Sequence, residues 1–306
     1  MENKAIVEKI LGLKKEKDIR IIGHFYTPEE VQPIADILSD SVGFFNSIKQ
    51  IPDDKRDLMV LGPIFFAQLA RTLLYGRDMT VYVPRLCECP VVNDQNMTFE
   101  KVLAFKEAHP GIPMVSYSTS PLNVIFLGDY LAMPGEVAPI INGIDAPAAL
   151  YVGDGNCGRF AIEHCNKKVI PYPGNPFCNT YSSIDYTDIE AARKEHPDGC
   201  LLIHPECDPK VAALSDHSLG TGAMEKLIAE SDDSRKFIIG AEVGFYHYLK
   251  RKFPNKIFIH LSPRLICNTF KSIRLTNVLD CLTNDKEVIT VDPVLAGRIY
   301  DIVKNR

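Results

Sequence analysis

The chain has 306 residues, of which 46% are hydrophobic and 24% are charged, a composition typical of a globular protein with room for two or three domains. Its formal net charge is −5 and no basic run is longer than KRK at 250–252, so neither nucleic acid nor an anionic membrane is expected as a main partner. Segment 1–18 alternates charged and apolar residues, and no stretch approaches the ~18 apolar residues of a membrane span. We therefore expect a cytoplasmic protein.

After the N-terminal helical pattern, the chain repeats one order of elements three times. Each repeat begins with an apolar strand that leads to a polar or aromatic residue: His24, Tyr117 and His204. A valine follows at +7 and an aspartate at +12, and we expect these aspartates to be mainly structural, tying helix ends or loops: Asp36, Asp129 and Asp216. A second strand then ends in glycine, a helical pattern follows, and a third strand leads to a cysteine: Cys89, Cys178 and Cys267.

This order of strand, helix, strand, helix and strand is typical of a small parallel, doubly wound layer. The predicted fold class is therefore α/β, with three pseudo-threefold-related domains of this kind around a central cavity. We place the domains at residues 1–108, 109–195 and 196–306, with the C-terminal segment free to pack back on the first. Ligands of open parallel sheets bind beyond the carboxyl ends of the strands, where the residues named above lie.

The cysteines after the third strands indicate a metal site with one open position. Cys89, Cys178 and Cys267 are separated by 89 residues in each step, so one thiolate per repeat is expected to converge near the pseudo-threefold axis. Three soft thiolates suit a [4Fe–4S] cluster, which normally has four, and the fourth iron would then act on substrate as a Lewis acid. Cys87, in the same LCECP stretch as Cys89, is expected to be structural or adjacent to the site.

The remaining cysteines have no threefold partners. Free cysteine behaves as a small hydrophobe, so we interpret them as core or incidental residues. They are Cys157, Cys165, Cys200, Cys207 and Cys281, of which Cys207 lies nearest the expected cavity.

Polar residues at two further repeated positions are candidates for the site. Those at +2 from the strand ends are Tyr26, Thr119 and Glu206, and those at +17 are Ser41, Pro134 and Thr221. Hydroxyls and N–H groups at helix N-termini bind phosphate or carboxylate, and a glutamate in a partly closed apolar cavity can serve as acid or base. The proton donors and acceptors expected nearest the metal are Tyr26, Tyr117, His204 and Glu206.

Three stretches resemble the quinolinate synthase family, and the resemblance covers nearly the whole chain. They are GHFYTPEEVQPIADILSDS (23–41), HPECDPKVAALSD (204–216) and GAEVG (240–244). The resemblance implies an enzyme of NAD biosynthesis with three pseudo-symmetric α/β domains and a [4Fe–4S] cluster on Cys89, Cys178 and Cys267.

That family condenses iminoaspartate with dihydroxyacetone phosphate, losing phosphate and two waters to give quinolinate. By resemblance, the catalytic residues are Tyr26, Tyr117, His204 and Glu206, with Tyr26 and Glu206 moving protons and Tyr117 lining the site. The implied substrate-binding residues are His24, Ser41, Thr119 and Thr221. The substrate is a small molecule, and the sequence leaves a homodimer open.

The chain departs from the family pattern mainly in the pocket. Where the family has an asparagine, a serine, a serine and a histidine, this chain has Thr119, Pro134, Gly220 and Tyr181; the usual glutamine after the first motif's tyrosine is Thr27. A proline removes a hydroxyl and an N–H, and losing donors to a buried anion costs roughly 1.5–3 kcal/mol each. Two other functions therefore stay open: a paralogue acting on another small hydroxylated or carboxylated metabolite, and a non-catalytic iron–sulfur sensor.

Overall fold

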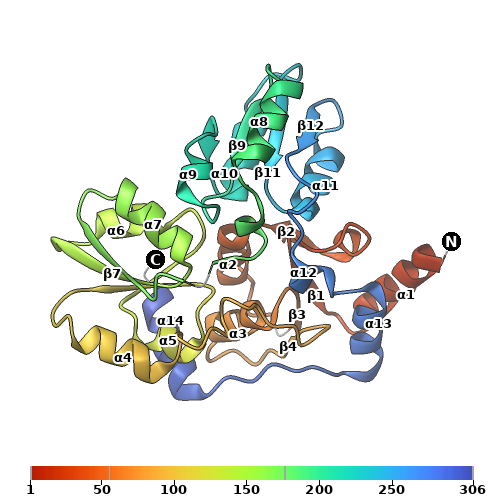
Figure 1. The fold of residues 1–306 in the computed structure, drawn as a ribbon. Coiled ribbons are helices and arrows are strands. Elements are labelled where there is room, and N and C mark those ends of the chain that lie inside the picture. The colour runs from red at the N-terminus through yellow and green to blue at the C-terminus, as the bar shows by residue number, and fades with distance from the viewer. Residues whose placement is uncertain (1, 55, 176, 305–306) are drawn as a thin grey trace. The chain divides into compact units, whose positions relative to one another are not determined.

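The computed structural model describes residues 2–54, 56–175 and 177–304, and its strands form three four-stranded parallel sheets (Figure 1). The chain divides into two compact units. The first unit comprises the residues up to Cys89 and those from Asn268 onwards, and the second unit is Pro90–Cys267. Each unit is described by itself.

The first unit holds one sheet, with strand order β2 (Ile37–Ser39), β1 (Arg20–His24), β3 (Leu58–Leu61) and β4 (Val81–Tyr82). Its helical segments are α1 (Glu2–Glu16), η1 (Gln32–Ile34), α2 (Ser41–Lys49), α3 (Ile64–Leu73), α12 (Asn268–Lys271), α13 (Leu275–Asn284) and α14 (Pro293–Lys304). The C-terminal helices pack within this unit, α13 against α1 and α14 against α3.

The second unit holds two sheets. The first has the order β6 (Tyr130–Ala132), β5 (Met114–Tyr117), β7 (Ala148–Val152) and β8 (Lys168–Tyr172), with helices α4 (Phe99–Glu107), α5 (Leu122–Leu127), α6 (Val137–Gly143) and α7 (Gly155–His164). The second has the order β10 (His217–Ser218), β9 (Cys200–Ile203), β11 (Lys236–Gly240) and β12 (Ile257–His260). Its helical segments are η2 (Tyr181–Ser183), α8 (Tyr186–Glu195), α9 (Pro209–Ala212), α10 (Thr221–Ala229) and α11 (Val243–Lys252).

Strand alternation explains how helices cover both faces of the sheet that contains β7. Val115 and Tyr117 of β5 point into a core made with α6 and α7, whereas Met114 points into the opposite core with α4 and α5. Figure 1 shows these two helix pairs on opposite faces of the sheet. The result is the doubly wound layer that the sequence predicts.

The three parallel sheets confirm the predicted fold class, but each contains one more strand than expected. The additional strands β2, β6 and β10 are edge strands of two or three residues. A strand this short has no room for a repeated hydrophobic pattern, so the sequence gives no signal for it. Each sheet lies inside one of the three expected segments, whose boundaries stay a prediction, as does the central cavity.

The aspartates at +12 tie each edge strand to its central strand. In all three sheets the aspartate N–H donates to a carbonyl of the central strand, at Ile21, Met114 or Leu201, over 2.8–3.0 Å. The Oδ2 of each aspartate accepts the N–H of the same residue, over 2.8 Å for Asp36, 2.9 Å for Asp129 and 2.6 Å for Asp216. These aspartates are structural, as predicted, and they bind helix ends as well as strands. Each forms an ion pair with a basic residue in the last turn of a preceding helix: Lys14 of α1 at 2.5 Å, Lys106 of α4 at 3.3 Å and Arg193 of α8 at 3.0 Å.

We expect Asp129→Ala to lower the free energy of unfolding by about 1–3 kcal/mol, because it leaves the N–H of Met114 without its acceptor in a buried strand. Urea unfolding measures this value. Asp145→Ala is the control, since Asp145 is exposed in a loop and its replacement should change stability by less than about 0.5 kcal/mol. Equal effects of the two variants would contradict the structural role of Asp129.

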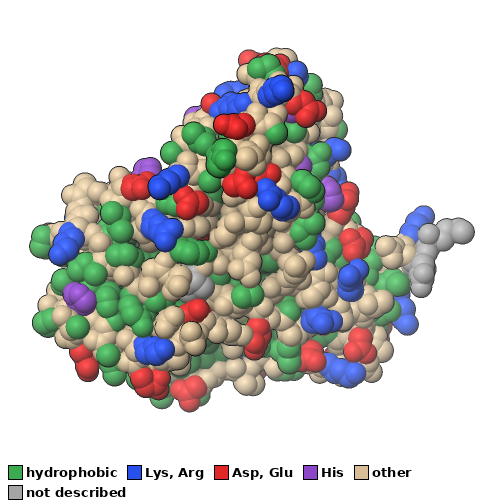
Figure 2. Space-filling view, in the orientation of Figure 1, with side chains coloured by type: hydrophobic (Ala, Val, Ile, Leu, Met, Phe, Trp, Pro, Cys, Tyr) green, Lys and Arg blue, Asp and Glu red, His purple; other side chains and the backbone are tan. Residues whose placement is uncertain are grey.

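Two observations concern the helices and the surface charges of the protein. No helix among the described residues is long and apolar enough to cross a membrane. On the face shown in Figure 2, acidic and basic side chains are interspersed rather than gathered by sign.

Candidate active site

Tyr117 and Glu206 form the centre of the candidate site in the second unit. Tyr117 is the last residue of β5, and Glu206 lies in the turn that follows β9. The hydroxyl of Tyr117 donates to Oε1 of Glu206 over 2.5 Å. Both side chains are buried, so a short hydrogen bond joins a phenol and a carboxyl group away from bulk water.

Three hydrogen bonds hold the turn that carries Glu206. The Nδ2 of Asn156 donates to the carbonyl oxygen of Glu206 over 2.9 Å, and the N–H of Cys207 donates to the carbonyl of His204 over 3.1 Å. The N–H of Glu206 donates to Nδ1 of His204 over 3.3 Å. Because Nδ1 is an acceptor here, the proton of the neutral imidazole resides on Nε2.

Burial keeps His204 neutral. Removal of the ring from water lowers the pKa of His204 to about 3. The ring also stacks on Tyr181, with centroids 4.3 Å apart and planes 7° from parallel. Nδ1 of His204 lies 3.9 Å from Oε2 of Glu206, yet a neutral ring forms no ion pair with it. His204 therefore contributes an N–H donor and shape rather than a charge.

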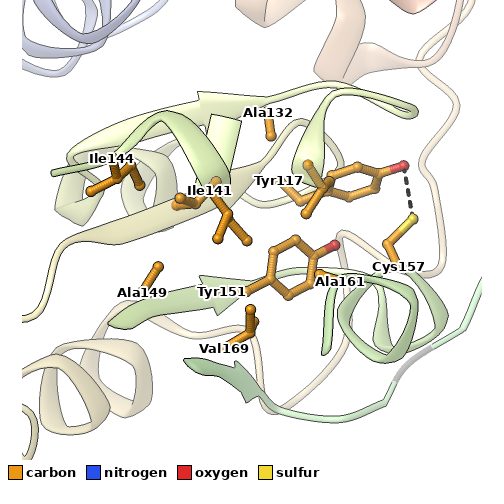
Figure 3. Packing of buried hydrophobic residues seen from close by; sticks show 11 residues of the cluster. Tyr117, Ala132, Ile141, Ile144, Ala149, Tyr151, Cys157, Ala161 and Val169 are labelled. Atoms are coloured by element: carbon orange, nitrogen blue, oxygen red, sulfur yellow. Dashed lines mark hydrogen bonds between the residues drawn. The ribbon is translucent and has the colours of Figure 1, made fainter. Parts of the chain in front are cut away.

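A buried thiol adjoins the Tyr117 hydroxyl. Sγ of Cys157, in α7, donates to Oη of Tyr117 over 3.6 Å, as the dashed line in Figure 3 marks. The thiol thus occupies one acceptor position of the hydroxyl, whose own proton points to Glu206. The close approach of β7 depends on Gly153, since a Cβ there would lie 2.3 Å from Cβ of Tyr117.

Desolvation raises the pKa values of the acidic groups of the site. Burial raises the pKa of Tyr117 well above its usual value, so the phenol remains a donor. Burial also raises the pKa of Glu206, while hydrogen bonds from Tyr117 and the Cys178 thiol act in the opposite direction. Burial, followed by the charge of Glu206, raises the pKa of Asp154 to about 8. The site therefore holds two carboxyl groups that keep their protons to a higher pH than in water, and that of Asp154 exchanges its proton near neutral pH.

Glu206→Gln should gain stability relative to the wild type as the pH rises. Because burial raises the pKa of Glu206, the folded state keeps the carboxyl proton above pH 4.5, where the unfolded chain has released it. Ionising the buried group then costs free energy that increases until the pH exceeds the folded pKa. Urea unfolding of the metal-free chains between about pH 5 and pH 8 measures the difference. A difference that does not change with pH would contradict the raised pKa.

Cys178 follows β8 and Cys267 follows β12 in the second unit, and Cys89 follows β4 in the first. In the described part of the chain none of the three forms a disulfide, and each is neither fully buried nor fully exposed. Soft, reachable thiols of this kind fit iron–sulfur ligation. Within the described ranges, no group of three or more His, Cys, Asp or Glu side chains is arranged to hold a metal ion. The cluster therefore stays a proposal.

Cys87 has a structural environment in the first unit. Its carbonyl oxygen accepts the N–H of Ile64 over 2.9 Å, at the first turn of α3. Leu265 does the same for Val243 at the start of α11, and Leu265 precedes Cys267 by two residues, as Cys87 precedes Cys89. Burial raises the pKa of the Cys87 thiol. These contacts support Cys89 as the ligand of the pair.

The expected substrate-binding residues of the second unit lie in its loops and helix starts. Thr119 follows β5 by two residues, and its Oγ1 is buried with no hydrogen-bond partner among the described residues. Thr221 is buried at the first position of α10, after the cap residue Gly220. Gly220 approaches the turn at Pro134, since a Cβ on Gly220 would lie 3.4 Å from the Pro134 carbonyl oxygen.

In the first unit, His24, Tyr26 and Ser41 lie together. Nδ1 of His24 accepts the N–H of Tyr26 over 3.2 Å, and Nε2 lies 3.3 Å from Oγ of Ser41. The rings of His24 and Tyr26 meet edge to face with centroids 4.3 Å apart. Lys271 fixes this turn by donating to the Tyr26 carbonyl over 2.7 Å. The turn after β1 thus repeats the His204–Glu206 geometry.

The sequence does not reveal several residues of the site. The repeat does not mark Asp154 or Asn156, and Cys157 is predicted to be a core or incidental residue. Cys157 is indeed buried, but it also contacts Tyr117. The sequence signal that could identify Asp154 is its position directly after the glycine that ends the second strand of its repeat.

The fold and this site define a class of protein: an α/β enzyme of small-molecule metabolism with a buried tyrosine–carboxyl hydrogen bond and cysteines beyond the carboxyl ends of parallel strands. The chain belongs to the quinolinate synthetase A protein family, whose model matches residues 8–305. It is 35% identical to the quinolinate synthase of Thermotoga maritima over 292 residues, 95% of each chain. It is 32% identical to quinolinate synthase 2 of Methanosarcina acetivorans over 285 residues, 93% of this chain and 89% of the relative. The quinolinate synthase of Geobacter metallireducens is 32% identical over 292 residues, 95% of this chain and 93% of the relative.

Proposed function

We propose that this protein is a quinolinate synthase, which condenses iminoaspartate with dihydroxyacetone phosphate and releases phosphate and two waters. Family membership supports the reaction class. The observation that carries the proposal is the buried Tyr117–Glu206 hydrogen bond of 2.5 Å, next to the thiol of Cys178. It supports Tyr117 and Glu206 as an acid–base pair close to one of the three expected cluster ligands.

The residues of the chain have distinct roles in this proposal. Glu206 takes a proton from the condensing substrates and returns one to a departing hydroxyl, for which its raised pKa suits it. Tyr117 keeps its proton and orients the carboxyl group. His204 offers its Nε2–H as a donor. Tyr26 transfers a proton to or from the second of the two condensing substrates.

Cys89, Cys178 and Cys267 would hold a [4Fe–4S] cluster, whose open iron supplies Lewis acidity toward a substrate hydroxyl or carboxylate. Thr119, Thr221, His24 and Ser41 would bind the substrates' anionic groups. Of these, Thr119 has a buried hydroxyl with no hydrogen-bond partner among the described residues. A donor of this kind is satisfied when a ligand binds.

One observation favours a second candidate, a paralogue that acts on another small hydroxylated or carboxylated metabolite. Pro134 stands where a hydroxyl and an N–H would serve an anion, and Tyr181 fills the space over His204. These changes alter the donors available to a phosphate or carboxylate. The chemistry of Glu206 and Tyr117 would be unchanged in that case.

Complementation of a bacterial strain that lacks quinolinate synthase tests the proposal. Anaerobic expression of the wild-type chain should restore growth without nicotinate, and the Cys178→Ala chain, expressed at the same level, should not. No growth with well-expressed wild-type protein would favour the paralogue. Restored growth by both chains would contradict the role of the cysteine.

A further inference from the structure

Two buried carboxylates in the second unit each bind a helix start and a cysteine loop at once. Asp154 is the N-cap of α7, and its Oδ1 accepts the N–H groups of Asn156 and Cys157 over 3.0 Å each. Its other oxygen, Oδ2, accepts the N–H of Cys178 over 2.8 Å. The residue is 1% exposed, so these bonds are made away from water.

Glu242 repeats this division between its two oxygens. It is the N-cap of α11, and its Oε2 accepts the N–H of Gly244 over 2.6 Å. Its Oε1 accepts the N–H of Cys267 over 3.0 Å, and the residue is 0% exposed. Two different side chains of different length thus reach the backbone of the two expected cluster ligands of this unit.

Ordinary helix capping does not require the second bond. Asp208 caps α9 with φ −52° and ψ 129°, close to the −56° and 129° of Asp154 and the −57° and 140° of Glu242. Its carboxylate accepts the N–H of Lys210 over 2.9 Å, yet its side chain is 44% exposed. A carboxylate that caps a helix can therefore remain at the surface, so burial against a cysteine loop is a separate feature.

The loop that carries Cys178 is also pressed against the start of α7. A Cβ on Gly155 would lie 2.2 Å from the carbonyl oxygen of Gly174, so only glycine permits this approach. The carboxylate of Asp154 thus lies between a helix and a loop whose separation the backbone already fixes. The length of the Asp154 side chain sets where the backbone N–H of Cys178 lies.

We propose that Asp154 and Glu242 are positioning residues for the cluster-binding loops of Cys178 and Cys267. This inference rests on the proposed cluster. Each carboxyl group fixes the main chain of a cysteine and so directs its thiolate before any iron binds. Groups behind metal ligands typically alter metal affinity by about 10–100-fold, and the hydrogen bonds and solvent exposure around a cluster alter its reduction potential.

Asp154→Asn and Glu242→Gln test the inference, because an amide presents an NH2 group to one of the N–H donors. Asp154→Ser is a second variant that keeps a helix cap but offers only one oxygen. Asp208→Asn is the matched control. For anaerobically reconstituted proteins, the measurements are iron and sulfide per chain, the rate of cluster loss to a chelator, and the reduction potential by spectroscopic titration.

We expect cluster loss about tenfold faster or more in the Asp154 and Glu242 variants, a reduction potential that differs from the wild type in Asp154→Asn and Glu242→Gln, and wild-type behaviour in Asp208→Asn. Circular dichroism identifies any variant that has not folded, and the inference is then judged on the variants that have folded. A wild-type cluster lifetime and potential in folded variants would overturn the inference alone. A reconstituted wild-type chain without a cluster would overturn both the inference and the proposed cofactor.

Discussion

Replacing Glu206 with glutamine is expected to lower kcat about 10²–10⁴-fold, the usual contribution of a positioned acid or base. Glutamine has the same shape and still accepts the hydrogen bond of Tyr117, but it exchanges no proton. The pocket should remain intact, so KM should change much less than kcat. Anaerobic steady-state assays with quinolinate quantified by chromatography measure both constants.

The control for this variant is Glu195→Gln, since the side chain of Glu195 is 78% exposed at the end of α8. Its kcat should equal that of the wild type. A Glu206→Gln enzyme within about threefold of the wild type would remove Glu206 from proton transfer. The Tyr117 hydroxyl would then be the next group to test.

Each of Cys89→Ala, Cys178→Ala and Cys267→Ala is expected to abolish the iron–sulfur absorbance of the anaerobically purified protein. Three thiolates are needed to hold the cluster, and the loss of one leaves two open irons. Cys87→Ala should retain the cluster, because the contact that links Cys87 to α3 is made by its backbone carbonyl. The measurement is the visible spectrum together with iron and sulfide per chain.

Cys165→Ala serves as the control for these variants, because Cys165 ends α7 and has no threefold partner in the sequence. It should match the wild type. Loss of the cluster in Cys87→Ala with retention in Cys89→Ala would show that the wrong member of the LCECP stretch was assigned.

The repeat makes much of the fold predictable. Three aspartates at one register predict three equivalent structural positions, and each indeed binds the same point of its central strand. The strands are recognisable because they are apolar runs that end at chemically distinct residues. The edge strands β2, β6 and β10 are not, since two or three residues contain no period.

The site is predictable where the repeat marks it and not elsewhere. Tyr117 and Glu206 occur at repeat positions, and the structure brings them together. Asp154 and Glu242 escape notice because they do not share a register: one follows its strand glycine directly and the other follows by two residues. The first repeat has Pro63 at the equivalent helix start, which cannot accept a hydrogen bond through its side chain.

Cys157 illustrates a different limit of the sequence. A buried cysteine is most often a small apolar side chain, and that description is correct for its packing with Ala161 and Tyr151. Only the fold shows that its thiol lies 3.6 Å from the Tyr117 hydroxyl. Composition and spacing do not reveal this contact, because it joins a helix to the end of a strand 40 residues earlier.

Product formation by the purified protein is the most direct test of the proposed function. The protein is isolated without oxygen, its cluster content is confirmed, and it receives iminoaspartate generated in place together with dihydroxyacetone phosphate. Steady formation of quinolinate is expected from the wild type and its loss from Glu206→Gln. An intact cluster with no quinolinate would contradict the proposed function and would favour a paralogue that acts on another small hydroxylated or carboxylated metabolite.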